Sequence, residues 1–351
     1  MIEKESRLCY TASDRSEAPL RRETVLAALR HEPTETIPYH IELTRDIRKS
    51  LCARIGVAEA GLDAWMGNYC AKVDLGGKGT SIAEGIHRDD FGVEWDRNGL
   101  DKDIGTVRDP VYPDPSFGDR GLPDPDTASA RANAERAALA AGDAALFGKI
   151  GATLFERAWS LCGFENFLMY TASDPDFAAE LLRRVCGHQL ALVEAVLDLP
   201  LQGFYFGDDY GQQGGTLFSL ETFRSLIKPE LARLFGPIKK AGKLVVLHSC
   251  GNIGAFLDDL IEIGLDAYQT VQPEVYDFAL LKRRYGKALA FWGGISTQTT
   301  LPFGNPDEVR AAARNAISIL GEGGGYIAGP THRITSDVPV ENVLALIKEL
   351  S

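Results

Sequence analysis

The feature that most constrains the fold of this chain is a regular alternation of short apolar runs with longer amphipathic stretches. The apolar runs, each marking one buried strand, cover residues 145–150, 203–206, 244–247, 267–271 and 289–292, and residues 326–327 start the last strand. A stretch with the helical period follows each run, and strands that alternate with helices at this spacing indicate a parallel sheet. With a further strand at residues 37–43, we count seven or eight strand–helix units. This count predicts an α/β fold, a (β/α)₈ TIM barrel.

Two segments depart from this rhythm. An amphipathic helix that begins at Arg21 and is ended by Pro33 precedes the first strand as an N-terminal helical extension. Residues 76–112 are rich in Gly and Asp and contain short alternating pieces, which predicts a hairpin insertion. Residues 1–18 are polar and irregular, so we expect a flexible leader. Because the alternation continues without a break, we expect residues 1–351 to form one domain.

Charge and cysteine usage exclude several classes of function. The chain has 351 residues and a net charge of −12, without a concentrated basic run, so we expect neither a nucleic-acid partner nor a polybasic membrane anchor. No run approaches the roughly 18 apolar residues of a membrane span, and the start of the chain lacks the apolar core of a signal peptide. The six cysteines are scattered, which favours reduced thiols and a cytoplasmic location.

The sequence K-L-V-V-L-H-S-C-G-N-I-G contains the first candidate site. His248 and Cys250 follow the buried strand predicted at residues 244–247. Residues two apart in an extended segment point to the same side, so an imidazole nitrogen and a thiolate sulfur could bind one metal ion there. The simpler interpretation is that Cys250 fills space in the core, because cysteine is among the most buried residues.

Other polar or aromatic side chains lie at or just after the carboxyl ends of predicted strands, the face that carries the chemistry of TIM barrels. They are His40, Glu42, Asp208, Asp209, Tyr210, Gln269, Trp292 and His332. Taken singly, each is more commonly a helix cap or a turn residue, Asp209 especially. Taken together, they predict a polar barrel mouth in which His40, Glu42, Gln269 and Trp292 bind substrate. His332, after the last strand, is a candidate third metal ligand or general acid.

Several stretches, in order, resemble the uroporphyrinogen decarboxylase superfamily. They include R-R-E-T-V-L-A-A-L-R-H-E-P, F-G-V-E-W, F-E-R-A-W-S-L-C-G-F-E-N-F-L, G-D-D-Y-G, V-L-H-S-C-G-N-I, F-W-G-G-I-S-T-Q and G-G-G-Y-I-A-G-P-T-H with D-V-P-V-E-N. The resemblance runs from about Arg21 to Leu350, and it implies a (β/α)₈ barrel.

Two branches of this superfamily imply different chemistry. The true decarboxylases use no metal and carry an arginine-rich R-Q-A-G-R motif for substrate carboxylates, which is missing here, where the chain reads I-P-Y-H-I-E-L-T-R-D. The cobamide-dependent methyltransferases bind zinc through His-x-Cys and a later cysteine. His248 and Cys250 match the first pair. The later cysteine is absent here, where the chain reads A-G-P-T-H. His332, or an oxygen from Asp208, Asp209 or Glu42, would replace it.

The resemblance to the second branch implies a zinc-dependent, corrinoid-dependent methyltransferase. Such an enzyme would move a methyl group between a small methylated substrate and a corrinoid (cobalamin) on a partner protein, and an O-demethylase of methoxylated compounds fits a site with few thiolates. Zinc would polarise the atom that loses the methyl group, and reduced corrinoid would accept the methyl group. Tyr210 or His332 would donate a proton or position the substrate.

Two alternatives stay open. A metal-free decarboxylase or lyase of a small acid or tetrapyrrole would use Asp208 or Asp209 to stabilise a protonated intermediate, with His332 as the acid. A non-catalytic corrinoid or tetrapyrrole binder is the other. Because a flat barrel face could pair two copies, a homodimer also stays open.

Overall fold

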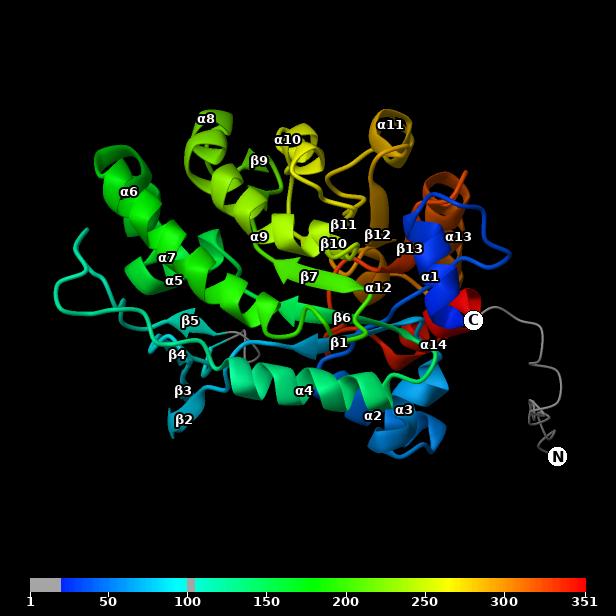
Figure 1. The fold of residues 1–351 in the computed structure, drawn as a ribbon. Helices are drawn as coiled ribbons and strands as arrows, with labels where there is room; N and C mark the ends of the chain where they lie inside the picture. Colours follow the sequence, from blue (N-terminus) through cyan, green and yellow to red (C-terminus); the bar gives the residue numbers. More distant parts are fainter. Residues whose placement is uncertain (1–19, 100–104) are drawn as a thin grey trace, which may run out of the picture.

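The computed structural model describes residues 20–99 and 105–351, so the leader predicted at residues 1–18 lies outside the described residues. Its main feature is a sheet of seven parallel strands, which helices surround (Figure 1). The strands, in their order across the sheet, are β1 (Cys70–Asp74), β6 (Ala145–Ile150), β7 (Gly203–Gly207), β10 (Leu244–His248), β11 (Ala267–Thr270), β12 (Ala290–Ile295) and β13 (Tyr326–Pro330).

An eighth, irregular segment at residues 38–43 closes this sheet into a barrel. Tyr39 pairs in parallel with Ala328 of β13. On the other side, the Tyr69 N–H, just before β1, donates to the Tyr39 carbonyl at 3.0 Å. The predicted (β/α)₈ barrel is therefore confirmed, whereas the strand predicted at residues 37–43 is an irregular segment with two isolated bridges. The strand that the apolar runs did not reveal is β1, in which the charged Lys72 interrupts the apolar pattern.

The helices lie close to the predicted stretches. Helix α1 (Arg21–Leu29) ends four residues before Pro33, and Gly163, at φ +90°, divides the helical stretch after β6 into two helices. The other helices are α2 (Arg45–Ile55), α3 (Glu59–Met66), α4 (Thr127–Ala140), α5 (Phe155–Cys162), α6 (Phe164–Ser173), α7 (Pro175–Glu194), α8 (Leu220–Thr222), the π-helix η1 (Phe223–Ile227), α9 (Lys228–Lys240), α10 (Leu257–Glu262), α11 (Phe278–Tyr285), α12 (Thr300–Phe303), α13 (Pro306–Leu320) and α14 (Val340–Leu350).

The barrel interior changes from apolar to polar along the strands. At the amino ends, small residues such as Ala145, Ala267 and Ala290 pack with Val25 and Leu29 of α1 in one buried cluster. Larger rings from Phe147, Tyr205 and Trp292 extend this cluster along the barrel. Helix α1 therefore closes the amino end, and the polar positions of the same strands are left at the carboxyl end.

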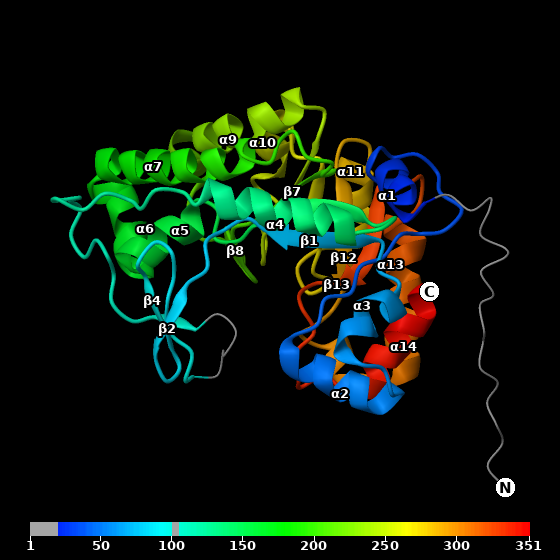
Figure 2. The same cartoon turned by 60° about the horizontal axis from the view of Figure 1, so that its bottom comes forward.

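The predicted insertion is present as a four-stranded antiparallel sheet, β2 (Thr80–Ala83), β3 (Ile86–Arg88), β4 (Glu94–Asp96) and β5 (Thr106–Val107). In Figure 1 the arrowheads of β1, β6 and β7 point toward the side where this sheet and α6 lie, and Figure 2 shows the sheet below α5 and α6. A buried ion pair joins the insertion to α5, because the Arg157 guanidinium lies 2.5 Å from the Asp89 carboxylate. The Asp89 carboxylate also accepts from the Trp95 indole at 3.0 Å. The insertion is thus fixed beside the carboxyl end of the barrel.

Among the residues that the structure describes, no helix is long and apolar enough to cross a membrane.

Candidate metal and substrate site

A cavity of about 610 Å³ opens at the carboxyl end of the barrel. Its lining includes the polar residues that the strand register turns inward, among them Lys72 of β1, Lys149 of β6, His248 of β10 and Gln269 of β11. Residues of the insertion complete the wall above them. A cavity of this size suits a small-molecule ligand.

His248 and Cys250 lie together on one wall of this cavity, as their spacing predicts. The Cys250 sulfur is 3.6 Å from His248 Nε2. Gly251, at φ +74°, lets the chain turn back against the loop after β7, where a Cβ would collide with Gly211 at 2.4 Å. The close approach is held by the Asn252 N–H, which donates to the Gln212 carbonyl at 2.9 Å. The glycine therefore fixes the direction in which Cys250 points.

His332 joins this pair from the loop after β13. The donor atoms of His248, Cys250 and His332 all lie within 4.8 Å of one another, and the two imidazole rings meet edge to face with centroids 5.4 Å apart. Two imidazole nitrogens and one thiolate are ligands that Zn²⁺ prefers. The donor set fits zinc, with the remaining position left to substrate or a further ligand.

Gln269 fixes the orientation of His248. Its amide Nε2 donates to the Thr331 carbonyl at 3.0 Å, so its Oε1 must be the atom that faces His248 Nδ1. Because Oε1 can only accept, His248 Nδ1 carries the proton and Nε2 presents its lone pair toward Cys250. The Tyr205 hydroxyl also donates to this Oε1 at 2.8 Å. Gln269, predicted as a substrate contact, thus supports His248 directly and the His332 loop through Thr331.

Burial keeps the three donors uncharged. Burial lowers the pKa of His332 to about 4, and electrostatic interactions with His248 and with the Arg333 guanidinium add to the effect. Burial also lowers the pKa of His248 and raises the pKa of the Cys250 thiol, and the neighbouring Asp209 carboxylate acts in the same direction on Cys250. Both imidazoles are therefore ready to bind a metal at neutral pH. The thiol must release a proton to do so.

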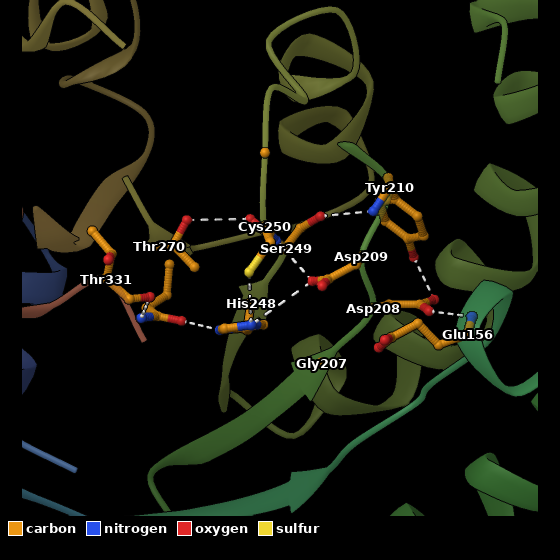
Figure 3. A network of polar contacts seen from close by, with 12 residues as sticks. Glu156, Gly207, Asp208, Asp209, Tyr210, His248, Ser249, Cys250, Thr270 and Thr331 are labelled. Atoms are coloured by element: carbon orange, nitrogen blue, oxygen red, sulfur yellow. Dashed lines mark hydrogen bonds and ion pairs between the residues drawn. The ribbon is translucent and has the colours of Figure 1, made fainter. Parts of the chain in front are cut away.

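The adjacent carboxylates of Asp208 and Asp209 have different surroundings (Figure 3). Asp209 lines the cavity, accepts from the Cys250 N–H at 2.7 Å and lies 3.8 Å from His248 Nε2. Asp208 is fully buried and turned away. It accepts backbone N–H groups at the start of α5, at 2.7–3.0 Å, and the Tyr210 hydroxyl at 2.7 Å.

Asp208 and Tyr210 were expected to be catalytic, but the structure places neither of them on the cavity wall. The side chain of Asp208 caps the amino end of α5, and Tyr210 is fully buried beside it. Burial raises the pKa of Asp208 to about 6, against the lowering effect of its backbone hydrogen bonds. We therefore assign both residues to positioning α5 and the loop after β7.

Glu156, in the first turn of α5, is a cavity residue that the sequence analysis did not single out. Burial raises the pKa of its carboxyl group well above its usual range, and the carboxylates of Asp209 and Asp208 add to this shift. The one signal in the sequence was its place shortly after the β6 strand, within F-E-R-A-W. Glu156 thus adds to the wall beside Asp209 a carboxyl group whose protonated form is favoured by burial.

The predicted substrate contacts His40, Glu42 and Trp292 also line the cavity, with Gln269. Lys72, which the sequence analysis missed, forms an ion pair with Glu42 and lies 4.3 Å above the Tyr205 ring. His40 packs edge to face on Trp292, with ring centroids 5.5 Å apart. Burial, reinforced by the charge of Lys72, lowers the pKa of His40 to about 3, so its imidazole is neutral.

Comparisons with known proteins agree with this architecture. The sequence profile of the family described as uroporphyrinogen decarboxylase (URO-D) matches residues 120–351. A methylcobamide:CoM methyltransferase, MtaA, from Methanosarcina barkeri is 30% identical over 190 residues, which are 54% of this chain and 53% of that protein. A uroporphyrinogen decarboxylase from Coxiella burnetii (strain Dugway 5J108-111) is 28% identical over 37% of this chain and 34% of its own length. The match thus spans about half of the first relative and a third of the second.

A solved structure, described as a methyltransferase from Methanosarcina mazei, covers 95% of this chain and 98% of its own with a TM-score of 0.72. At 19% identity this likeness supports the fold alone.

Proposed function

The chain belongs to the uroporphyrinogen decarboxylase family, and on this premise we propose that it is a zinc-dependent methyltransferase. The enzyme would transfer a methyl group between a small methylated substrate in the barrel cavity and a corrinoid on a partner protein. The convergence of His248, Cys250 and His332 within 4.8 Å carries the proposal. The similarity to the MtaA methyltransferase over about half its length supports the same branch of the family.

The donor set suits chemistry at an ether oxygen. Bound to His248, Cys250 and His332, Zn²⁺ would act as a Lewis acid on the substrate atom that carries the methyl group. With one thiolate and two neutral imidazoles, the site carries less negative charge than a site with two thiolates. It therefore suits the harder oxygen of a methoxyl group at least as well as a sulfur. We accordingly place O-demethylation first among the methyl transfers that this site could support.

Residues around the donors would align the site. Gln269 keeps the His248 lone pair on the cavity side, and Asp209 holds the Cys250 backbone through its N–H. Because these hydrogen bonds already hold the metal-binding residues in position, no rearrangement is needed when the metal binds. Such supporting hydrogen bonds raise the affinity for the metal. Glu156, a carboxyl group with a raised pKa on the same wall, would be the acid that donates a proton to a substrate oxygen as the bond from that oxygen to the methyl group breaks.

The test is methyl transfer to free cob(I)alamin. Purified protein loaded with zinc should convert cob(I)alamin to methylcobalamin, seen by absorbance, when supplied with one of a panel of methoxylated and methylthio compounds. The same protein stripped with a chelator should lose this activity and regain it with zinc. No transfer from any compound by zinc-replete protein would contradict the proposal and favour a non-catalytic binder.

The second candidate is a metal-free decarboxylase or lyase of a small acid. The similarity to the decarboxylase from Coxiella burnetii supports it, and Asp209 and His332 both face the cavity. Asp208 drops out of this alternative because it caps α5. Release of carbon dioxide from a supplied acid by chelator-treated protein would favour this candidate over methyl transfer.

A further inference from the structure

Three of the cations that line the cavity are neutralised by carboxylates of the protein. The Lys72 ammonium pairs with Glu42, and the Lys149 ammonium lies 3.3 Å from the Asp74 carboxylate. In the third pair, already described, Arg157 binds Asp89. Each of these charges is thus balanced within the protein. Such pairs fix side chains in place and leave little attraction for an added anion.

Arg333 is a cavity cation of another kind. It is half-buried and lines the cavity immediately after His332. Among the described residues, no carboxylate lies within 4.0 Å of its guanidinium, and no hydrogen bond or ring contact engages it. A partly desolvated guanidinium without a counter-ion is unfavourable unless an anion binds beside it.

The backbone holds Arg333 firmly toward the cavity. The Ile334 N–H donates to the Glu42 carbonyl at 2.8 Å, and the Thr44 N–H donates to the Ile334 carbonyl at 2.9 Å. On the other side, the Thr331 N–H donates to the Ile295 carbonyl at 2.8 Å. These bonds fix the backbone position from which the Arg333 side chain reaches the cavity.

We propose that Arg333 binds a carboxylate of the substrate, so that the substrate is a small methylated carboxylic acid. The planar guanidinium offers two parallel N–H donors that match the two oxygens of a carboxylate. The methyl-bearing atom of the same molecule would then lie toward His248, Cys250 and His332. The methylated nature of the acid rests on the proposed function, whereas the anion site itself does not.

The cavity limits what else such an acid can contain. Trp292 and Tyr205 line its depth, and Trp95 and Trp159 line it nearer the insertion. These rings provide flat apolar contacts for a planar body. With about 610 Å³ available, a methoxylated aromatic acid is within range. Methoxybenzoates are therefore suitable probes.

The test compares acids with neutral molecules of the same shape. Isothermal titration calorimetry would measure the binding of 2-, 3- and 4-methoxybenzoate, with the three methoxybenzamides as neutral counterparts, and of methoxyacetate against methoxyacetamide. Wild-type protein should bind at least one acid about tenfold more tightly than its amide, as expected for a charge-assisted bidentate contact. Arg333→Gln should remove this preference and leave the affinity for the amide within about twofold. Arg333→Lys should retain part of it.

Two controls separate this inference from other effects. Arg310→Gln removes a half-buried arginine of α13 that pairs with Asp307, and it should leave the preference for acids unchanged. Cys250→Ala should lose zinc but keep that preference, so a failed zinc site and a failed anion site give different results. Equal binding of every acid and its amide by wild type would overturn the proposal. So would an equal loss of acid and amide binding in a folded Arg333→Gln protein.

Discussion

Two sides of the same cavity differ in the charge of their side chains. The metal side, formed by His248, Cys250, Gln269 and His332, contains uncharged donors, and hydrogen bonds of Gln269 fix the orientation of His248. The charged side, formed by Glu42, Lys72, Lys149 and Arg333, contains ion pairs and one guanidinium without a partner among the described residues. Neutral buried donors suit a metal cation, whereas an unbalanced guanidinium suits an anion. The two ends of a substrate would therefore be bound differently, the methyl-bearing atom at the metal side and the carboxylate at the charged side.

Removing the metal-side thiol should have the largest effect. Cys250→Ala should weaken zinc binding by about 100-fold or more, because a ligand in a protein zinc site contributes roughly 3 kcal/mol on average. Chelator competition would measure the dissociation constant. The matched control is Cys52→Ala, which removes a buried cysteine of α2 and should keep wild-type affinity. Equal affinities in the two variants would remove Cys250 from the metal side.

Gln269 should be the next most sensitive position. Gln269→Leu removes the acceptor for His248 Nδ1 and should weaken zinc binding by roughly 10–100-fold, the usual effect of losing a hydrogen bond to a metal ligand. Gln269→Glu keeps an acceptor and should recover part of the affinity. If both variants bind zinc like wild type, Gln269 does not support the metal side.

The charged side should respond in stability instead. Glu42→Gln leaves the Lys72 ammonium buried without its partner, which should lower the free energy of unfolding by roughly 1–3 kcal/mol, less than for a fully buried pair. Denaturant titration would measure it, and Glu42→Gln with Lys72→Met should recover most of the loss. Zinc affinity should stay within about twofold. A large drop in zinc affinity would show that the two sides are not separate.

The smallest expected effect is the change in zinc affinity for each pH unit. Both imidazoles have lowered pKa values, about 4 for His332, so they are neutral at pH 7 and above. The Cys250 thiol has a raised pKa and must lose its proton on binding. Zinc affinity should therefore rise about tenfold for each pH unit between 7 and 8. Cys250→Ala should have a flat profile, and a steeper wild-type slope would mean that a histidine also releases a proton.

The sequence was sufficient to predict the barrel and much of its mouth. Apolar runs mark strands, and the carboxyl ends of parallel strands meet, so the meeting of His248 with His332 could be anticipated although 84 residues separate them. Strand β1 escaped because Lys72 points into the barrel, and a charged residue inside a strand looks like surface. Only the three-dimensional pairing with Glu42 makes that lysine acceptable.

The direction in which side chains point at the strand ends could not be predicted from the sequence. Asp208 and Asp209 are adjacent and chemically identical, yet one caps α5 and the other lines the cavity. Which of them points inward depends on where α5 begins, and that is a tertiary feature. Glu156 was missed for a related reason, because it reaches the cavity from a helix rather than from a strand end. Arg333 directly follows the predicted ligand His332, but the sequence does not reveal whether a carboxylate pairs with the arginine in the fold.

The most direct test of the central claim is X-ray absorption at the zinc edge on the zinc-loaded protein. We predict one sulfur at about 2.3 Å and a shell of nitrogen or oxygen at about 2.0–2.1 Å that includes two imidazoles. His332→Ala should show one imidazole fewer with the sulfur unchanged. A shell with two or more sulfurs, or a wild-type protein that binds no zinc when fully supplied with it, would contradict a site built from His248, Cys250 and His332.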